Sequence, residues 1–130
     1  MAKYLIEVNY IGDGISGLLK EGGTKRRAAV DQLFESVGGK VEAYYFAFGE
    51  RDVFIIGDLP DNVTATALAL RVNSTGTALC KTTVLLTPQE VDEAVRKPGM
   101  YRPPGYDLDQ AEAAWDYEGG HLSSDLSDNS

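Results

Sequence analysis

The chain has 130 residues, of which 43% are hydrophobic and 25% are charged. This is the composition of one ordinary globular domain, and it excludes a fully disordered chain, a collagen-like fibre and a disulfide scaffold. The net charge of −8 is uneven, because residues 1–97 carry eleven Lys or Arg and thirteen Asp or Glu, whereas residues 98–130 carry one Arg and seven acids. The body is therefore nearly neutral and the tail is acidic.

Three further features of the sequence limit the environment and the partners of the chain. The single cysteine, Cys80, excludes an intrachain disulfide and fits a reducing compartment. The only basic cluster, residues 25–27, is more typical of an exposed helix turn than of a nucleic-acid contact. The sequence shows no secretory signal pattern and no apolar span of about 18 residues. We therefore expect a cytoplasmic protein that binds neither nucleic acid nor a membrane.

The first half of the chain predicts a strand, a helix and a β-hairpin. Residues 4–10 alternate with the period of two that a half-buried strand shows, and a glycine-flanked short apolar turn follows at residues 15–19. Apolar residues then recur at helical spacing from Lys25 to Val37, with Thr24 as a cap. Residues 40–48 and 53–56 are rich in aromatic and β-branched side chains, and their short connection predicts the hairpin.

The second half predicts a helix, a strand and a last short helix. Residues 63–72 are rich in Ala and Leu, and Pro60 or Asp61 starts this helix. We expect its apolar face to consist of Val63, Ala67 and Leu70, with Ala69 beside them. Residues 77–87 alternate again as a strand does, and residues 88–97 are expected to form the last helix.

The order β-α-β-β-α-β with a terminal helix predicts an α+β fold of the ferredoxin-like type, which is one antiparallel sheet with two helices packed on one face. The strands carry apolar or aromatic residues on both sides, such as Leu5 beside Ile6 and Phe54 beside Val53. A solvent-facing side would be more polar. We therefore expect the second face to be covered by a partner chain or by the terminal extension, or to line a small-molecule cavity.

The sequence changes character at Pro98, which we take as the boundary between a domain of residues 1–97 and an acidic C-terminal arm of residues 98–130 that contains several Pro and Gly. Apolar residues around Trp115 predict that residues 98–118 pack as an arm on their own or a neighbouring subunit. The alternative is a floppy tail with one isolated Trp. The last ten residues have the composition of a disordered segment.

An ordered set of short steps runs through about 90 residues of the chain. The set comprises Gly14-Ile15, Arg27-Ala28-Ala29, Gly38-Gly39-Lys40-Val41, the turn Gly49 to Asp52, Pro60-Asp61, Ala67-Leu68-Ala69-Leu70, Ser74-Thr75-Gly76 and Leu86-Thr87-Pro88-Gln89-Glu90. In these steps the chain resembles the GYD-domain proteins, which are small bacterial proteins. The resemblance implies a ferredoxin-like fold that pairs as a dimeric α/β barrel, and it implies little about chemistry.

One position departs from the pattern of that family. The family usually has glycine, a variable residue, tyrosine and aspartate in the hairpin, whereas this chain reads Gly49-Glu50-Arg51-Asp52. An activity that the tyrosine carries in relatives would therefore not transfer to a chain with Arg51.

No signature in the sequence requires a particular reaction, metal or cofactor, and we expect none of the latter two. Gly12, Gly14 and Gly17 match the spacing of a dinucleotide-binding loop, but no parallel β-α-β unit follows, so a turn with a short helix is favoured. With one His and one Cys, the chain cannot form a metal site with two histidine ligands or one with several thiolate ligands. Cys80 at mid-strand is expected to be a small buried apolar group, and His121 is expected to be exposed to solvent.

The candidate site residues are expected around the free face of the sheet, where an apolar pocket with a few polar groups would be typical of a ligand site. The candidates for acid–base catalysis are Tyr10, Tyr45, Asp52 and Glu7. The candidates for ligand binding are Tyr44, Phe46, Phe48, Phe54, Arg51, Arg71 and Lys81. Two structural alternatives compete with these roles: an ion pair between Glu7 and Lys81, and a turn role for Asp52 in which its side chain accepts backbone N–H groups.

Three functions remain open from the sequence. The first is a small-molecule-binding or assembly module that forms homodimers or higher homo-oligomers through its sheet face and takes a small apolar or aromatic ligand. The second is a cofactor-free enzyme, such as an isomerase, cyclase or oxygenase, that acts on a small aromatic or cyclic metabolite. The third is an adaptor that docks a protein partner through residues 98–118.

Overall fold

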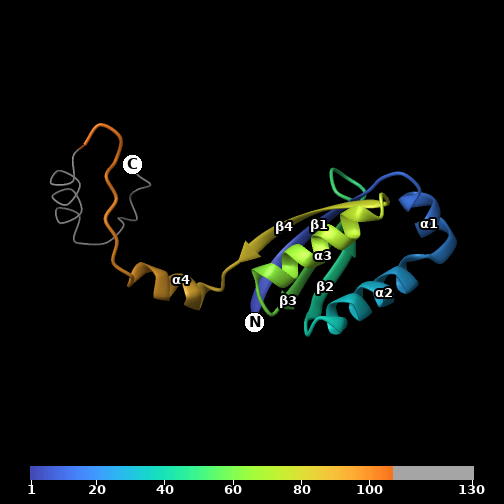
Figure 1. Ribbon diagram of the computed structural model, residues 1–130, viewed down its shortest axis with the longest axis horizontal. Coiled ribbons are helices and arrows are strands. Elements are labelled where there is room, and N and C mark those ends of the chain that lie inside the picture. Colours follow the sequence, from blue (N-terminus) through green and yellow to red (C-terminus); the bar gives the residue numbers. More distant parts are fainter. Residues whose placement is uncertain (107–130) are drawn as a thin grey trace. The chain divides into compact units, whose positions relative to one another are not determined.

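The structure is a computed structural model that describes residues 1–106, and these residues divide into two units, 1–85 and 86–106. The first unit contains seven elements in the predicted order (Figure 1). These elements are β1 (Ala2–Tyr10), α1 (Gly14–Glu21), α2 (Gly23–Ser36), β2 (Lys40–Phe46), β3 (Val53–Leu59), α3 (Asn62–Ser74) and β4 (Ala78–Leu85). The second unit contains α4 (Pro88–Val95).

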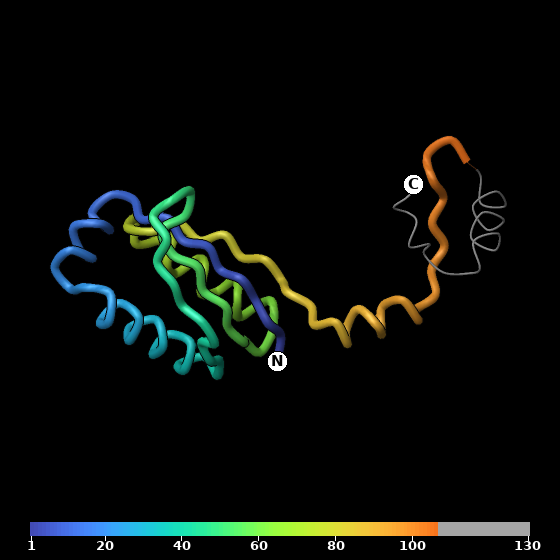
Figure 2. Tube along the Cα trace, turned by 180° about the vertical axis from the view of Figure 1, so that it is seen from behind, coloured from blue at the N-terminus to red at the C-terminus, as the bar shows by residue number. Residues whose placement is uncertain are grey.

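The four strands form one antiparallel sheet in the order β2-β3-β1-β4. Helices α2 and α3 lie on the same face of this sheet (Figure 1). Figure 2 views the first unit from behind, where the strands lie in front and none of its helices covers them. The predicted ferredoxin-like arrangement, an α+β fold with helices on one face, is confirmed.

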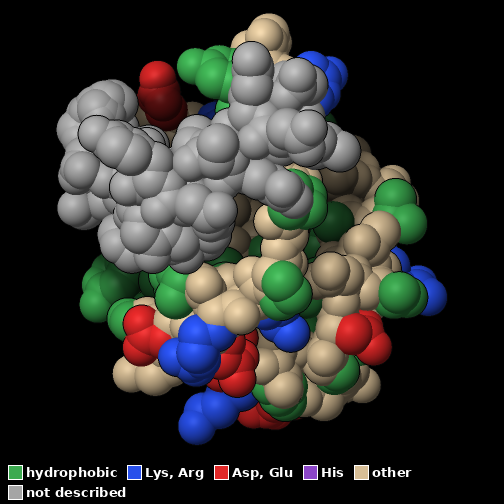
Figure 3. Space-filling view, turned by 90° about the vertical axis from the view of Figure 1, so that its left-hand side faces the viewer, with side chains coloured by type: hydrophobic (Ala, Val, Ile, Leu, Met, Phe, Trp, Pro, Cys, Tyr) green, Lys and Arg blue, Asp and Glu red, His purple; other side chains and the backbone are tan. Residues whose placement is uncertain are grey.

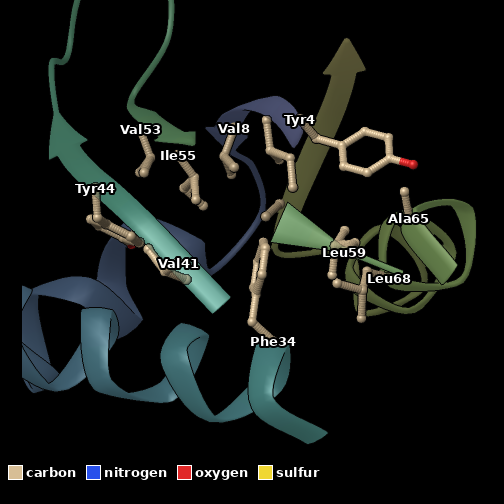
Figure 4. Close-up of a cluster of buried hydrophobic side chains, with 12 residues drawn as sticks. Tyr4, Val8, Phe34, Val41, Tyr44, Val53, Ile55, Leu59, Ala65 and Leu68 are labelled. Atoms are coloured by element: carbon tan, nitrogen blue, oxygen red, sulfur yellow. The ribbon is translucent and has the colours of Figure 1, made fainter. Parts of the chain in front are cut away.

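The core of the first unit lies between the sheet and the two helices. Side chains that alternate along β1 and β3 point into it, among them Tyr4 and Leu59, which are almost completely buried. Figure 4 shows Phe34 of α2 and Leu68 of α3 lying among these strand residues. Gly57 of β3 leaves room for the ring of Phe34, because a Cβ atom there would lie 2.6 Å from Phe34 Cε2.

Helix α3 shows a difference between the predicted and the observed buried face. Asp61 caps the helix as expected, since its carboxylate accepts a hydrogen bond from Thr64 N at 2.8 Å. The predicted apolar face is wrong, however, because Val63 and Leu70 are 79% and 65% exposed while Ala65 and Leu68 are buried. Apolar residues occur on both sides of this helix, so helical spacing alone does not define the side that packs on the sheet.

The short apolar turn predicted at residues 15–19 is part of the eight-residue helix α1. Gly12 just before this helix and Gly14 at its start allow the backbone of residues 76–77 to approach closely. A Cβ atom on Gly14 would lie 2.1 Å from Thr77 O, and one on Gly12 would lie 2.6 Å from Gly76 O. Every strand pairing of the sheet is antiparallel. This sheet therefore lacks the parallel β-α-β unit of a dinucleotide-binding fold, as the sequence indicates.

The second unit begins with the predicted last helix, whose bounds are Pro88–Val95. Thr87 and Glu90 form a capping box, in which the Thr87 hydroxyl accepts from Glu90 N and the Glu90 carboxylate accepts from Thr87 N. Several predictions fall outside the described residues. They concern most of the arm at 98–118 with Trp115, the exposure of His121, and the last ten residues. Within residues 1–106, no helix combines the length and apolar character needed to cross a membrane.

Candidate functional site

A cavity of about 370 Å³ lies between the sheet and helices α2 and α3. All four strands contribute to its walls, and most of the lining side chains are apolar. The lining residues are Ile6, Val8, Tyr10, Arg26, Ala29, Val30, Leu33, Tyr44, Val53, Ile55, Ala65, Leu68, Ala69, Val72, Thr75, Thr77, Ala78, Cys80 and Thr82. Its volume and its apolar lining are those of a small-molecule site.

Two tyrosines from different strands supply phenol groups to this cavity. Tyr10 ends β1, and Tyr44 of β2 is 9% exposed. Burial raises the pKa of both phenols, and each also affects the pKa of the other, which shows that the two hydroxyl groups lie close together. Both side chains are therefore protonated at neutral pH and able to donate hydrogen bonds.

Two arginines of α2 hold positive charge beside these phenols. The guanidinium of Arg27 lies 5.8 Å from the centre of the Tyr44 ring, a distance at which a cation is attracted to the ring face. Arg26 lines the cavity, and its charge opposes the rise in the pKa of Tyr10 and of Tyr44. Its Nη1 atom also contacts Glu21 Oε2 at 3.1 Å.

The remaining polar groups of the lining are three threonines and the thiol of Cys80. The hydroxyl groups of Thr75 and Thr77 are 2.7 Å apart at the connection between α3 and β4. Burial raises the pKa of the Cys80 thiol, so this group stays protonated and poorly nucleophilic at neutral pH. The described residues contain no group of three His, Cys, Asp or Glu side chains placed to hold a metal ion.

The opposite face of the sheet carries exposed apolar side chains that the first unit leaves uncovered. Tyr45 of β2, Phe54 of β3 and Leu79 of β4 are 71%, 37% and 49% exposed. Phe54 is in register with both Tyr45 and Glu7, so these residues lie side by side across three strands. We call this surface the open face.

An ion pair lies within the open face, but not the one that the sequence suggested. Arg51 Nε donates to Glu7 Oε1 at 3.0 Å, and Arg51 Nη1 contacts Asn9 Oδ1 at 3.4 Å. Lys81 is in register with Glu7 across β1 and β4, yet the ion pair recorded for Glu7 is with Arg51. The hairpin places the Arg51 guanidinium above β1, so the arginine that departs from the family pattern holds Glu7 and Asn9 together.

The structure separates the predicted site residues between the two faces. The open face contains five of them, as expected: Glu7, Tyr45, Phe54, Arg51 and Lys81. The placement of Tyr10, Tyr44 and Phe46 on that face is wrong, because Tyr10 and Tyr44 line the cavity and Phe46 packs on the core.

Parity along the strands explains this error. Tyr10 follows the same alternation as the buried residues of β1. In β2 the pairing register shifts between Val41 and Ala43. The extra residue of this bulge brings Tyr44 onto the face of Val41, which a strict period of two would not allow.

The other predicted residues lie in the hairpin connection and on α3. Asp52 has the turn role, since its Oδ2 accepts a hydrogen bond from Tyr10 N at 2.8 Å while its own N–H donates to Val8 O at 2.9 Å. Phe48 stacks on Phe46 with ring centres 5.8 Å apart and has a φ of 58°, which is unusual for a bulky side chain. Arg71 is exposed in the last turn of α3, outside the cavity lining.

Sequence reasoning did not identify the helix residues of the cavity. Ala29, Val30 and Leu33 follow the helical spacing of α2, which indicates burial without distinguishing a packed core from a cavity wall. For Arg26 the sequence indicates only an exposed basic cluster at residues 25–27. Figure 3 shows one other side of the molecule, on which basic and acidic side chains lie interspersed with hydrophobic ones.

Comparison with known proteins gives a family and no curated relative. No curated protein matches the chain. The family model of the GYD domain matches residues 4–95, which are well over half of the chain and include every helix and strand described above, apart from the first two residues of β1. The chain therefore belongs to the GYD-domain family.

Proposed function

We propose that this protein is a small-molecule-binding module, which takes a largely apolar ligand into the cavity between its sheet and helices and forms a homodimer through its open face. The cavity carries the proposal. Ligand sites are typically clefts or cavities of about 300–1,000 Å³ with mostly apolar walls and a few polar groups. A cavity of about 370 Å³ in the middle of a small domain is compatible with a site for an occupant.

The make-up of the cavity indicates an aromatic or cyclic occupant. Its apolar walls come from Ile6 and Ile55 on the sheet side and from Leu33 and Leu68 on the helix side. These two walls face each other, which suits a flat apolar body inserted between them. The phenols of Tyr10 and Tyr44 add donors that fix the orientation of a ligand.

The open face supports the homodimer. Leu5 is in register with Ile56, so an apolar centre spans β1 and β3, and Thr83 of β4 lies on the other side of Leu5. Ionic groups flank this centre, since Lys3 contacts Asp58 at 3.1 Å near one end of β1 and Arg51 binds Glu7 nearer the other. An apolar centre with a polar rim is the usual anatomy of a protein interface.

Light scattering after size exclusion tests the homodimer. We expect twice the mass of one chain for the wild type, and a shift towards one chain for Phe54→Glu, because a buried unpaired carboxylate is costly at an interface. Leu70→Glu on α3 is the matched control, since Leu70 is exposed on another surface, and it should leave the mass unchanged. A wild type with the mass of one chain would refute the homodimer.

A titration with 1-naphthaleneacetamide, a neutral aromatic probe, tests the cavity. Chemical shifts in ¹H–¹⁵N NMR spectra should change at cavity residues such as Val30, Leu68 and Val72. Residues of the open face such as Leu79 serve as the reference, and their signals should stay in place. Absence of any shift at cavity residues at millimolar probe would contradict the ligand site.

The Tyr10–Tyr44 pair favours a second candidate function, a cofactor-free enzyme acting on a small aromatic or cyclic metabolite. Two protonated phenols inside an apolar cavity are able to donate a proton or a hydrogen bond to a bound carbonyl. Native mass spectrometry of the purified protein would reveal a co-purified molecule. Its conversion on incubation by the wild type but not by Tyr44→Phe would support this function, and an unchanged molecule would contradict it.

The third function, an adaptor that docks a partner through residues 98–118, stays a prediction. The described part of this segment, residues 98–106, contains no helix or strand. Deletion of residues 98–130 should abolish partner capture and leave the first unit folded if the arm is the docking element.

A further inference from the structure

Most of the polar groups of the cavity lie around Tyr10, whereas Thr82 is in register with Ile6 and Cys80 with Val8. Tyr10 is in register with Ala78 at the start of β4, and Thr77 directly precedes Ala78. Arg26 comes from the start of α2 and is close enough to Tyr10 and Tyr44 to affect the pKa of both. We call Tyr10, Tyr44, Arg26, Thr75 and Thr77 the polar end.

Apart from Cys80 and Thr82, the rest of the lining is hydrocarbon. Ile6 is in register with Ile55, and both side chains are buried. Ala65 and Leu68 of α3 are also buried and lie in the same lining. The cavity therefore has an apolar body and one polar end, so a complementary ligand is itself apolar with one polar group.

The Tyr44 hydroxyl has unused hydrogen-bonding capacity. A phenol has one donor and two acceptor positions, and a buried tyrosine usually finds partners for its hydroxyl group. Tyr10 is the hydrogen-bonding neighbour of the Tyr44 hydroxyl, and the charges of Arg26 and Arg27 also act on this phenol. Tyr44 is a buried residue that lines the cavity, so a ligand group could supply a further partner for its hydroxyl.

The guanidinium of Arg26 also has donors to spare. A guanidinium carries five N–H donors in a planar fork that fits a carboxylate. Glu21 Oε2 contacts Nη1 at 3.1 Å, and the hydrogen bonds of the described residues include no acceptor for the other N–H groups of Arg26. The polar end thus combines two phenol donors with the guanidinium of Arg26, which is paired with Glu21 on one side.

We infer that the ligand of the cavity is an aromatic acid, whose carboxylate binds Arg26 and the phenols of the polar end while its ring lies between the apolar walls. This inference rests on the proposed function, because it presupposes that the cavity takes a ligand. Donors gathered around one end of an apolar cavity recognise an anion, and charge-assisted hydrogen bonds are the stronger ones.

The test compares 1-naphthaleneacetate with 1-naphthaleneacetamide, which share the ring and nearly the same shape but differ in charge. Affinities come from the NMR titration of the full chain described above. We expect the wild type to bind the acid about tenfold more tightly than the amide, as a charge-assisted hydrogen bond provides. Arg26→Gln should remove this preference, because it weakens binding of the acid more than binding of the amide.

Two further variants separate a specific contact from a general effect of charge. Lys25→Gln removes the same charge from the neighbouring, exposed position of α2 and should keep the preference. Glu21→Gln frees the guanidinium from its ion pair and should strengthen binding of the acid.

The outcomes distinguish the inference from the proposed function. Equal affinity for acid and amide in the wild type, or a preference that survives Arg26→Gln, would overturn the aromatic acid and leave the cavity as a ligand site. If neither probe shifts the signals of cavity residues, both the proposed function and this inference are wrong. If Arg26→Gln fails to fold, Tyr44→Phe replaces it, and the expected result is a reduced preference for the acid.

Discussion

Filling the cavity with a side chain should both stabilise the protein and compete with its ligand. Ala69 of α3 lines the cavity, and Ala69→Phe adds a phenyl ring that occupies only part of a volume of about 370 Å³. Burying a Phe side chain in apolar surroundings contributes about 1.5–3 kcal/mol. The lower helix propensity of Phe costs about 0.5 kcal/mol. We therefore expect the free energy of unfolding to rise by about 1–2 kcal/mol, and Tm by about 5–10 °C.

The assay is thermal and urea unfolding followed by circular dichroism, together with the NMR titration of 1-naphthaleneacetamide. Ala67→Phe is the matched control, because Ala67 is exposed on the same helix and an added ring there stays in solvent. We expect no gain in stability for this control and unchanged binding of the probe. Our reasoning would be refuted if Ala69→Phe lost stability relative to Ala67→Phe, as overpacking of a filled core does, while binding stayed at the wild-type level.

Three more changes test the fold around the cavity. Gly57→Ala brings a Cβ atom within 2.6 Å of the buried Phe34 ring, so it should lower the free energy of unfolding by about 1–3 kcal/mol. Gly49→Ala is the control, because a Cβ atom there meets nothing within 4 Å, and it should leave the free energy of unfolding unchanged. Urea unfolding measures both variants. Hydrogen bonds from Thr64 lower the pKa of the Asp61 carboxyl. The stabilising effect of the ionised Asp61 is therefore present above the usual carboxyl pKa and is lost as the pH falls. Asp61→Asn should make the stability of the protein depend less on pH in the acid range. Burial raises the pKa of the Tyr44 phenol, so the unfolded chain loses this proton at a lower pH than the folded protein does. Stability should therefore fall above about pH 10, and it should fall less steeply in Tyr44→Phe. An equal slope in both proteins would contradict the burial of this phenol.

The order of the elements was predictable from the sequence because each has a clear period. Residues 4–10 alternate strictly, and the observed β1 keeps that alternation from Tyr4 to Val8. The helices and the hairpin were likewise marked by capping and turn residues, such as Asp61 and the glycines of the connections. Local patterns therefore define this sheet with helices on one face.

The position of the cavity was not predictable from the same patterns. One extra residue in β2 moves Tyr44 to the helix-covered face, and nothing in the composition of residues 40–46 marks that bulge. Helix α3 is apolar on both sides, so only the packed structure shows that Leu68 is buried and Leu70 exposed. Whether a cavity forms also depends on how the elements pack. The sequence pattern of Val30 and Leu33 would be the same in a filled core.

The contact between ligand and protein tests the central claim most directly. Intermolecular nuclear Overhauser effects between the ring protons of bound 1-naphthaleneacetamide and protein methyl groups locate the ligand on one face of the sheet. We predict effects to the methyl groups of Val30 and Leu68, which line the cavity. Effects to Leu5 and Leu79 instead would place the ligand on the open face and contradict the cavity as the binding site.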